Sequence, residues 1–175
     1  MATNIEDEDA GLRARFAARD GSCAGEDQLK CDLVLRPPAL LAAFPLVVSD
    51  EWEPVPGRTE YGRGDLVFAD GRGHYAVVEV KWMNPPGDGR TARRRRNRKR
   101  DVAPVQAWRY ASLLLKVRPD AIDVRVMAFT NDWQHPGLID LGLAQRPEPE
   151  APASVGERWR QRGMTTNDKH SSLSD

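Results

Sequence analysis

The chain has 175 residues, of which 40% are hydrophobic and 30% charged, and its 26 basic and 26 acidic residues give a formal net charge of zero. This length and composition predict one folded domain with polar tails. The net charge excludes a uniformly basic protein, and no apolar run approaches the ~20 residues that cross a bilayer. The N-terminus, with four consecutive acidic residues at 6–9, is typical of neither a secretory signal nor a transit peptide. We therefore expect an intracellular protein without a membrane partner.

The sequence contains two cysteines, Cys23 and Cys31. Two cysteines are too few for a disulfide framework, and the three histidines lie too far downstream to complete a zinc site with them. We therefore expect two reduced thiols.

The N-terminal third changes from polar to apolar sequence. Residues 1–28 are polar and acidic and predict a flexible tail, with a short helix at 11–19 as its one ordered segment. Dense apolar sequence begins near residue 29, and we expect the folded domain to cover 29–143. The Pro-Pro pair at 37–38 suits the first turn of a following helix. A strand-like segment then runs over 47–52.

The strongest local pattern predicts a β-hairpin. Two apolar strands at 65–68 and 75–82 are separated by the turn sequence Asp-Gly-Arg-Gly. Because successive side chains of a strand face opposite sides, Val77, Glu79 and Lys81 are expected on one face of the second strand.

The second half of the chain predicts one helix and two further strands. We expect a flexible Arg-rich loop at 84–100, followed by a helix at 101–117 whose first turn contains a proline. Alternating and apolar residues predict a strand at 122–130 and a last strand at 138–143. From residue 144 to the C-terminus, Pro, Glu, Arg and Ser dominate, which predicts a disordered tail.

The hairpin brings together residue types that can hold a metal ion. It places Asp65, at the start of one strand, beside Glu79, near the end of the other. Two carboxylates suit Mg²⁺, which accepts a few hard oxygen ligands and keeps its other positions for waters and phosphate oxygens. Lys81 lies on the same face and could act on a metal-bound water or stabilise charge at a phosphorus atom.

These residues resemble the signature of a known superfamily. Gly-Arg-Gly-Asp65, followed after thirteen residues by Glu79-Val-Lys81, is similar to the motif of the PD-(D/E)XK nucleases. Gln106-Ala-Trp-Arg-Tyr110 resembles the Gln-x-x-x-Tyr element of the exonuclease branch of that superfamily. The resemblance covers about residues 40–132. It implies a restriction-endonuclease-like α/β fold, with a mixed central sheet flanked by helices, and a nuclease that depends on Mg²⁺ or Mn²⁺.

The resemblance also implies roles for individual residues. Asp65, Glu79 and the backbone carbonyl of Val80 would bind the metal, and Lys81 would be the catalytic lysine. Gln106 and Tyr110 would support catalysis from the helix that flanks the site.

Three features depart from the superfamily pattern. Gly64 stands where the motif has proline, and no histidine precedes Asp65 as it often does in the exonuclease branch. The superfamily commonly supplies a further glutamate from an upstream helix. Glu60 is the first candidate for this ligand and Glu26 the weaker one.

Each motif also has a purely structural interpretation. Asp65 could cap a turn, and Glu79 with Lys81 could form the exposed stripe of a half-solvated strand. We favour the site for these three residues because both strands have the apolar sequence of buried strands. Gln106 and Tyr110 lie four apart on one helix face and could equally form a surface pair.

The Arg-rich segment is the main basic feature of the sequence. Eight of its eleven residues are cationic: Arg90, Arg93, Arg94, Arg95, Arg96, Arg98, Lys99 and Arg100. The segment has three interpretations: an arm that binds nucleic-acid phosphates, a nuclear localisation signal or a solvated charged loop. As a localisation signal it would make the protein nuclear; otherwise we expect a cytoplasmic protein. No aromatic residues interleave with the arginines, so base stacking is not indicated.

Three functions are compatible with these features. The leading one is a metal-dependent nuclease that hydrolyses phosphodiester bonds of DNA or RNA. The second is a catalytically inactive nucleic-acid-binding module on the same fold. The third is an interaction protein whose Arg-rich segment is a nuclear targeting signal. Because the domain is small, a homodimer or a protein partner is compatible with each of them.

Overall fold

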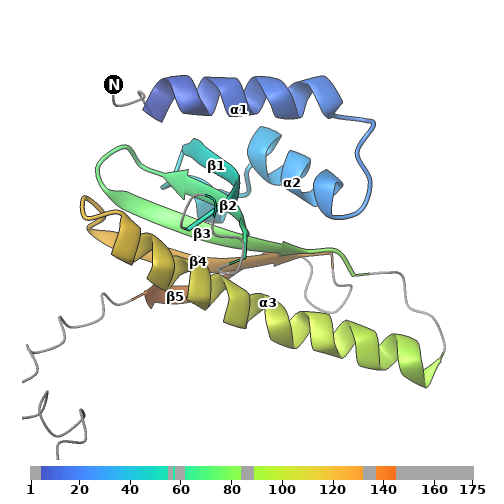
Figure 1. The fold of residues 1–175 in the computed structure, drawn as a ribbon. Helices are drawn as coiled ribbons and strands as arrows, with labels where there is room; N and C mark the ends of the chain where they lie inside the picture. Colours follow the sequence, from blue (N-terminus) through green and yellow to red (C-terminus); the bar gives the residue numbers. More distant parts are fainter. Residues whose placement is uncertain (1–4, 55–56, 58–61, 84–88, 132–136, 145–175) are drawn as a thin grey trace, which may run out of the picture.

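The computed structural model describes residues 5–54, 57, 62–83, 89–131 and 137–144. They form an α/β structure in which a central sheet is covered by two helices on one face and by a long helix on the other (Figure 1). In chain order the elements are α1 (Ile5–Arg19), α2 (Glu26–Leu35), the short 3-10 helix η1 (Ala39–Leu41), β1 (Leu46–Trp52), β2 (Gly64–Ala69), β3 (His74–Lys81), α3 (Arg90–Val117), β4 (Asp123–Thr130) and β5 (Gly137–Ala144).

The sheet is mixed and its strands follow the order β1-β2-β3-β4-β5. The pairs β1–β2, β2–β3 and β4–β5 are antiparallel, whereas β3 and β4 are parallel. Parallel neighbours need a crossover connection, and α3 provides it. The predicted α/β class with a mixed sheet between helices is therefore confirmed.

The two sheet faces have separate apolar cores. Val78 and Val80 of β3 pack with α1 and α2, whereas Val77 packs with α3. This alternation confirms the predicted division of the β3 side chains. All residues of β2 are buried, because helices cover both faces of the sheet at this strand.

Of the predictions for 1–28, the short helix at 11–19 is confirmed as part of α1, whereas the flexible tail is wrong for the described residues around it. α1 packs on the sheet through Leu12 and the fully buried Phe16, which lie four apart on one helix face. Charged residues of α1 also take part in its attachment. Asp9 accepts a hydrogen bond of 2.7 Å from the N–H of Val47 and pairs with Arg13 at 2.9 Å. Although its sequence is acidic, α1 is therefore an ordered helix that is hydrogen-bonded to β1.

The flexible loop expected over 84–100 is corrected from residue 90 onward, because α3 begins at Arg90, eleven residues before the predicted start. Residues 84–88 of this prediction lie outside the described part of the chain. Arginine and lysine are good helix formers, and the segment from 90 to 100 contains no glycine or proline. Pro104, expected in the first turn, lies inside the helix, which therefore lacks one backbone donor there. The Arg-rich half of α3 runs beyond the end of the sheet (Figure 1).

Other expectations had mixed outcomes. The hairpin and the later strands are confirmed, whereas α2 was not predicted and the helix after the Pro-Pro pair is only η1.

Cys23 and Cys31 are both free, as expected, with their sulfur atoms 3.0 Å apart. Apart from Ala144 in β5, the predicted C-terminal tail lies outside the described residues. None of the described helices combines the length and the apolar character needed to cross a membrane.

Gly64 provides a test of the packing around β2. A Cβ at this position would lie 2.9 Å from Cδ1 and Cε2 of Trp52 and would overlap its Nε1. We therefore expect Gly64→Ala to lower the free energy of unfolding by about 1–3 kcal/mol, as overpacking does. Gly11→Ala, in the open middle of α1, is the control. It should raise stability by about 0.5–1 kcal/mol. Chemical denaturation measures both, and a neutral Gly64→Ala would contradict this packing.

Candidate active site

The candidate site lies where β2 begins and β3 ends. Leu66 of β2 pairs with Val78 of β3, so continuing this register places Asp65 opposite Glu79. Asp65 is two residues before Val67, and Glu79 is two residues after Val77; both valines face α3. Because side chains two apart in a strand share a face, both carboxylates belong to the face that α3 covers. The hairpin therefore assembles the predicted pair.

Asp65 is buried, with 8% of its surface exposed, and both of its carboxylate oxygens have partners. Its Oδ2 accepts a hydrogen bond of 2.8 Å from the N–H of Val80. Its Oδ1 lies 3.1 Å from the Nζ of Lys30, while Nζ of Lys81 is 3.8 Å from Oδ2. The described contact of Val80 with the site is thus through its N–H, and a metal-ligand role of its carbonyl stays a prediction.

Glu79 is the more deeply buried carboxylate, with 2% exposed surface. Its Oε1 lies 2.7 Å from the Nζ of Lys81, but its buried Oε2 has no hydrogen-bond partner. Burial, and then the negative charges of Asp65 and Glu26, raise the pKa of Glu79 to about 7, against the opposing effect of Lys81. A cation bound beside Glu79 would therefore stabilise its ionised form.

Lys81 is an ammonium held among carboxylates. Burial lowers the pKa of Lys81, but its hydrogen bond to Glu79 and the charges of Glu79, Asp65 and Glu26 outweigh burial and raise the pKa above its ordinary value. A lysine in this state donates hydrogen bonds and positive charge. It can orient a water or stabilise a phosphate, whereas it is poorly suited to remove a proton.

Glu26, the first residue of α2, reaches the site from the other helical layer. Its Oε1 lies 3.5 Å from the Nζ of Lys81, and its Oε2 accepts a hydrogen bond of 3.2 Å from the N–H of Trp82. The structure therefore brings the weaker of the two candidate glutamates to the site, whereas Glu60 lies outside the described residues. From the sequence alone Glu26 is the weaker candidate, and no helix is predicted at 26–35 to place it.

Lys30, which sequence analysis did not place in the site, is also part of this cluster. Its side chain is 4% exposed and contacts carboxylates of three residues: Asp65 at 3.1 Å, Asp50 at 3.5 Å and Glu51. One signal could have found it. Lysine is scarce in this sequence relative to arginine, and the buried Lys30 and the half-buried Lys81 both lie at this site.

α3 contributes the predicted helix pair. Tyr110 is 4% exposed and packs edge-on against Trp52, with ring centroids 6.1 Å apart. Burial, followed by the charges of Glu79 and Asp65, raises the pKa of Tyr110, which keeps its phenol protonated. The Oε1 of Gln106 is buried without a hydrogen-bond partner. The surface-pair alternative therefore does not describe these residues.

The residues present fit a hard divalent cation. The Oε2 of Glu79 is a buried acceptor without a hydrogen bond, a state that costs about 1–3 kcal/mol. A cation, or a water bound to it, would satisfy this oxygen. Among the described residues no three His, Cys, Asp or Glu side chains form a ready metal cluster. Two carboxylates with waters in the remaining positions are typical of Mg²⁺.

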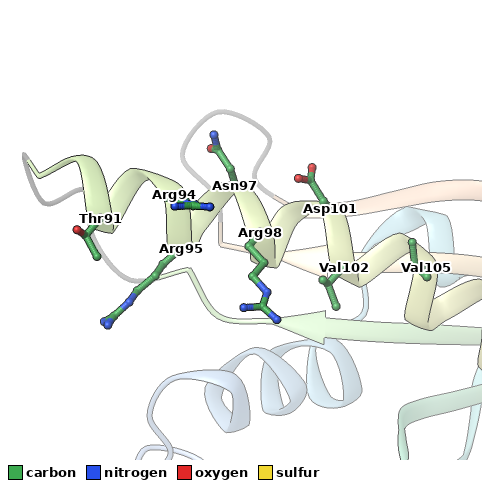
Figure 2. Close-up of a pocket in the computed structure, with 8 residues that line it drawn as sticks. All are labelled: Thr91, Arg94, Arg95, Asn97, Arg98, Asp101, Val102 and Val105. Carbon is green, nitrogen blue, oxygen red and sulfur yellow. The ribbon is translucent and has the colours of Figure 1, made fainter.

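The Arg-rich half of α3 borders this site. Lys99 donates a hydrogen bond of 2.8 Å to the backbone carbonyl of Trp82, the residue after Lys81. Five of the eight predicted cations are exposed: Arg90, Arg93, Arg94, Arg95 and Arg98. Figure 2 shows an open hollow along this half of the helix, with Arg95, Arg98 and Val102 pointing to one side. A flexible polyanion can reach these side chains without entering the core.

Comparisons of the chain with protein-family models, with curated proteins and with solved structures find no match.

The raised pKa of Glu79 predicts how stability depends on pH. Between its ordinary value near 4.5 and about 7, the folded protein keeps a proton that the unfolded chain has lost. In the metal-free protein this favours folding at the low end of that window, and the contribution of up to about 3 kcal/mol is lost as pH rises through 7. Glu79→Gln should remove this dependence, measured as the change in Tm across the window.

Glu53→Gln is the control, because its effect has the opposite sign. The hydrogen bond from the N–H of Gly57, together with Arg63, lowers the pKa of Glu53. Its contribution to stability is therefore present above pH 4.5 and lost as pH falls further. A Tm difference between Glu79→Gln and the parent protein that is constant from pH 4.5 to 8 would contradict the proposed environment of Glu79.

Proposed function

We propose that this protein is a metal-dependent nuclease that hydrolyses phosphodiester bonds of DNA or RNA, on a restriction-endonuclease-like fold of the PD-(D/E)XK superfamily. The observation that carries the proposal is the buried pair of Asp65 and Glu79 beside the Lys81 ammonium, with one oxygen of Glu79 left without a partner. The mixed sheet between helical layers is also the arrangement that the sequence resemblance implies.

The site residues would have separate roles in metal binding, charge stabilisation and substrate orientation. Asp65 and Glu79 would hold Mg²⁺ or Mn²⁺, together with the predicted Val80 carbonyl. When bound, such a metal lowers the pKa of a water and polarises a phosphate. Lys81 donates hydrogen bonds from its ammonium to the attacking water or to a phosphate oxygen, where it stabilises the charge that develops. Gln106 and Tyr110 orient water or substrate from α3.

The position of the basic helix supports a nucleic-acid substrate. The exposed arginines lie on the part of α3 before Lys99, and Lys99 is hydrogen-bonded to the residue after β3. A nucleic-acid backbone bound along this part of α3 would therefore extend toward Lys81. Contacts with phosphates position a nucleic acid without reading its sequence. The proposed substrate is therefore a phosphodiester backbone, with the sequence preference left to other contacts.

A cleavage assay tests the proposal directly. The purified chain is incubated with single- and double-stranded DNA and RNA in Mg²⁺, in Mn²⁺ and in EDTA. We expect metal-dependent cleavage, and we expect Asp65→Asn to reduce it to the level seen in EDTA, because the site loses a ligand charge while keeping its shape. Binding of the uncleaved substrate should persist in this variant. Full activity of Asp65→Asn would remove the assignment.

Lys81→Met tests the role of the ammonium. It should lower turnover by about 10²–10³-fold, the magnitude of losing one preorganised electrostatic stabiliser. Lys81→Arg should not restore activity, because the planar guanidinium is larger and shaped for bidentate contacts. Lys116→Met, at an exposed position near the end of α3, is the matched control. Equal loss of activity in both methionine variants would assign the effect to general charge and not to the site.

The basic helix is tested by replacing Arg94, Arg95 and Arg98 with glutamine, which preserves helix propensity. Nucleic-acid binding should weaken, and the slope of log affinity against log salt should fall by about 0.9 for each duplex phosphate contact removed. Glutamine at the exposed Arg109 of the same helix is the control and should leave the slope unchanged. If the run serves only nuclear import, the triple variant will bind as before and only its location in cells will change.

One observation favours the second candidate function, a nucleic-acid-binding module without catalysis. Lys30 already forms an ion pair with Asp65, so the charge of this carboxylate is balanced without a metal. In this case the chain binds nucleic acid equally in EDTA and in Mg²⁺, and it cleaves none of the substrates in the assay above.

A further inference from the structure

Lys30 brings a second ammonium to the same carboxylate pair. It lies on α2, whereas Lys81 belongs to β3, and its side chain is almost completely buried at 4% exposure. Its Nζ lies 3.1 Å from the Oδ1 of Asp65, the oxygen that the N–H of Val80 does not use. A metal that binds Oδ1 of Asp65 must therefore share this oxygen with Lys30 or displace it.

Lys30 has two other anionic partners close by. On β1, Asp50 lies 3.5 Å from its Nζ, and Glu51 forms an ion pair with it. Glu51 has a φ of 51°, in the left-handed region that residues other than glycine rarely adopt. From this position the exposed Glu51 carboxylate contacts the buried ammonium. Lys30 can therefore leave Asp65 without losing every counter-charge.

We propose that Lys30 is an internal counter-cation of the metal site, which binds Asp65 in the metal-free protein and withdraws to Asp50 and Glu51 when a divalent metal binds. This inference rests on the proposed function, because it assumes that Asp65 is a metal ligand. Lys30 is a positioning residue and not a catalytic one, since it acts on the metal through Asp65. It would set the metal affinity and prevent repulsion between the buried carboxylates in the absence of metal.

The alternative is a static ion pair in which Lys30 only holds Asp65 in place. The two roles predict opposite effects on metal binding. A competing ammonium weakens binding, so removing it must tighten binding, because a positive charge a few ångströms from a divalent cation repels it strongly. A static support strengthens binding, so removing it must loosen binding.

The experiment titrates the full chain with Mn²⁺ alone, without nucleic acid, by isothermal calorimetry. We expect Lys30→Met to bind Mn²⁺ roughly tenfold more tightly than the parent protein. We expect Glu51→Gln to bind it roughly threefold more weakly, because Lys30 then has one partner fewer on β1 and stays on Asp65. Lys116→Met is the control and should bind as the parent does.

A double-mutant cycle separates this mechanism from simple loss of charge. If Glu51 acts through Lys30, Glu51→Gln should have no effect on Mn²⁺ affinity in the Lys30→Met background. Glu51→Gln also protects the test against misfolding, because it changes an exposed side chain and keeps the buried lysine. An equal effect of Glu51→Gln in both backgrounds would overturn the coupling of Glu51 to Lys30.

The outcomes distinguish this inference from the proposed function. Equal or weaker Mn²⁺ binding by Lys30→Met overturns the counter-cation but leaves the nuclease proposal intact. If the parent, Lys30→Met and Glu51→Gln proteins all fail to bind Mn²⁺ at millimolar concentration, both fall. Asp65→Asn tests whether the metal binds at this carboxylate. In the Lys30→Met background it should abolish the tight binding of Mn²⁺. Persistent tight binding would place the metal elsewhere and overturn the inference.

Discussion

The burial of two carboxylates side by side is the constraint on which the rest of this structure depends. Asp65 and Glu79 lie between helical layers, where neither charge is well solvated. The negative charge of each carboxylate also makes ionisation of the other less favourable. The fold compensates from both sides of the sheet. Lys81 comes from β3 itself, and Lys30 crosses from α2, so the two layers are joined through charge as well as through their apolar cores.

How much of this could be predicted depends on the sequence separation of the partners. Fifteen residues after Asp65, the hairpin returns to it, so strand alternation and a recognisable turn suffice to bring Asp65, Glu79 and Lys81 together. Lys30 lies 35 residues before Asp65, and Glu26 lies 55 residues before Lys81. Both belong to a helix with weak amphipathic patterning, so nothing local indicates their position. The start of α3 was missed for a different reason: a run of like charges was interpreted as solvated loop, although arginine favours helix.

The glycine at position 64, where the motif that the sequence resembles has proline, has a physical explanation in the packing beside the site. Trp52 lies against the backbone of Gly64 so closely that any Cβ would meet its indole, and proline also carries a Cβ. Trp52 in turn packs against the ring of Tyr110. Gly62 approaches the Tyr110 hydroxyl with similarly little room, since a Cβ there would lie 2.6 Å from its oxygen. The glycines before Asp65 thus make space for the aromatic pair that positions α3 over the carboxylates.

α3 therefore has two roles that its sequence divides at Pro104. After the proline, Ala107, Tyr110 and Ala111 pack against the sheet and complete the buried site. Before it, the helix runs past the sheet and presents arginines to solvent, with Lys99 joining it to the end of β3. Helix formation is cooperative, so the packed half supports the folded state of a half that buries almost nothing. The Arg-rich segment is in this way held as a helical basic surface beside the carboxylates, where Lys99 ties it to the end of β3.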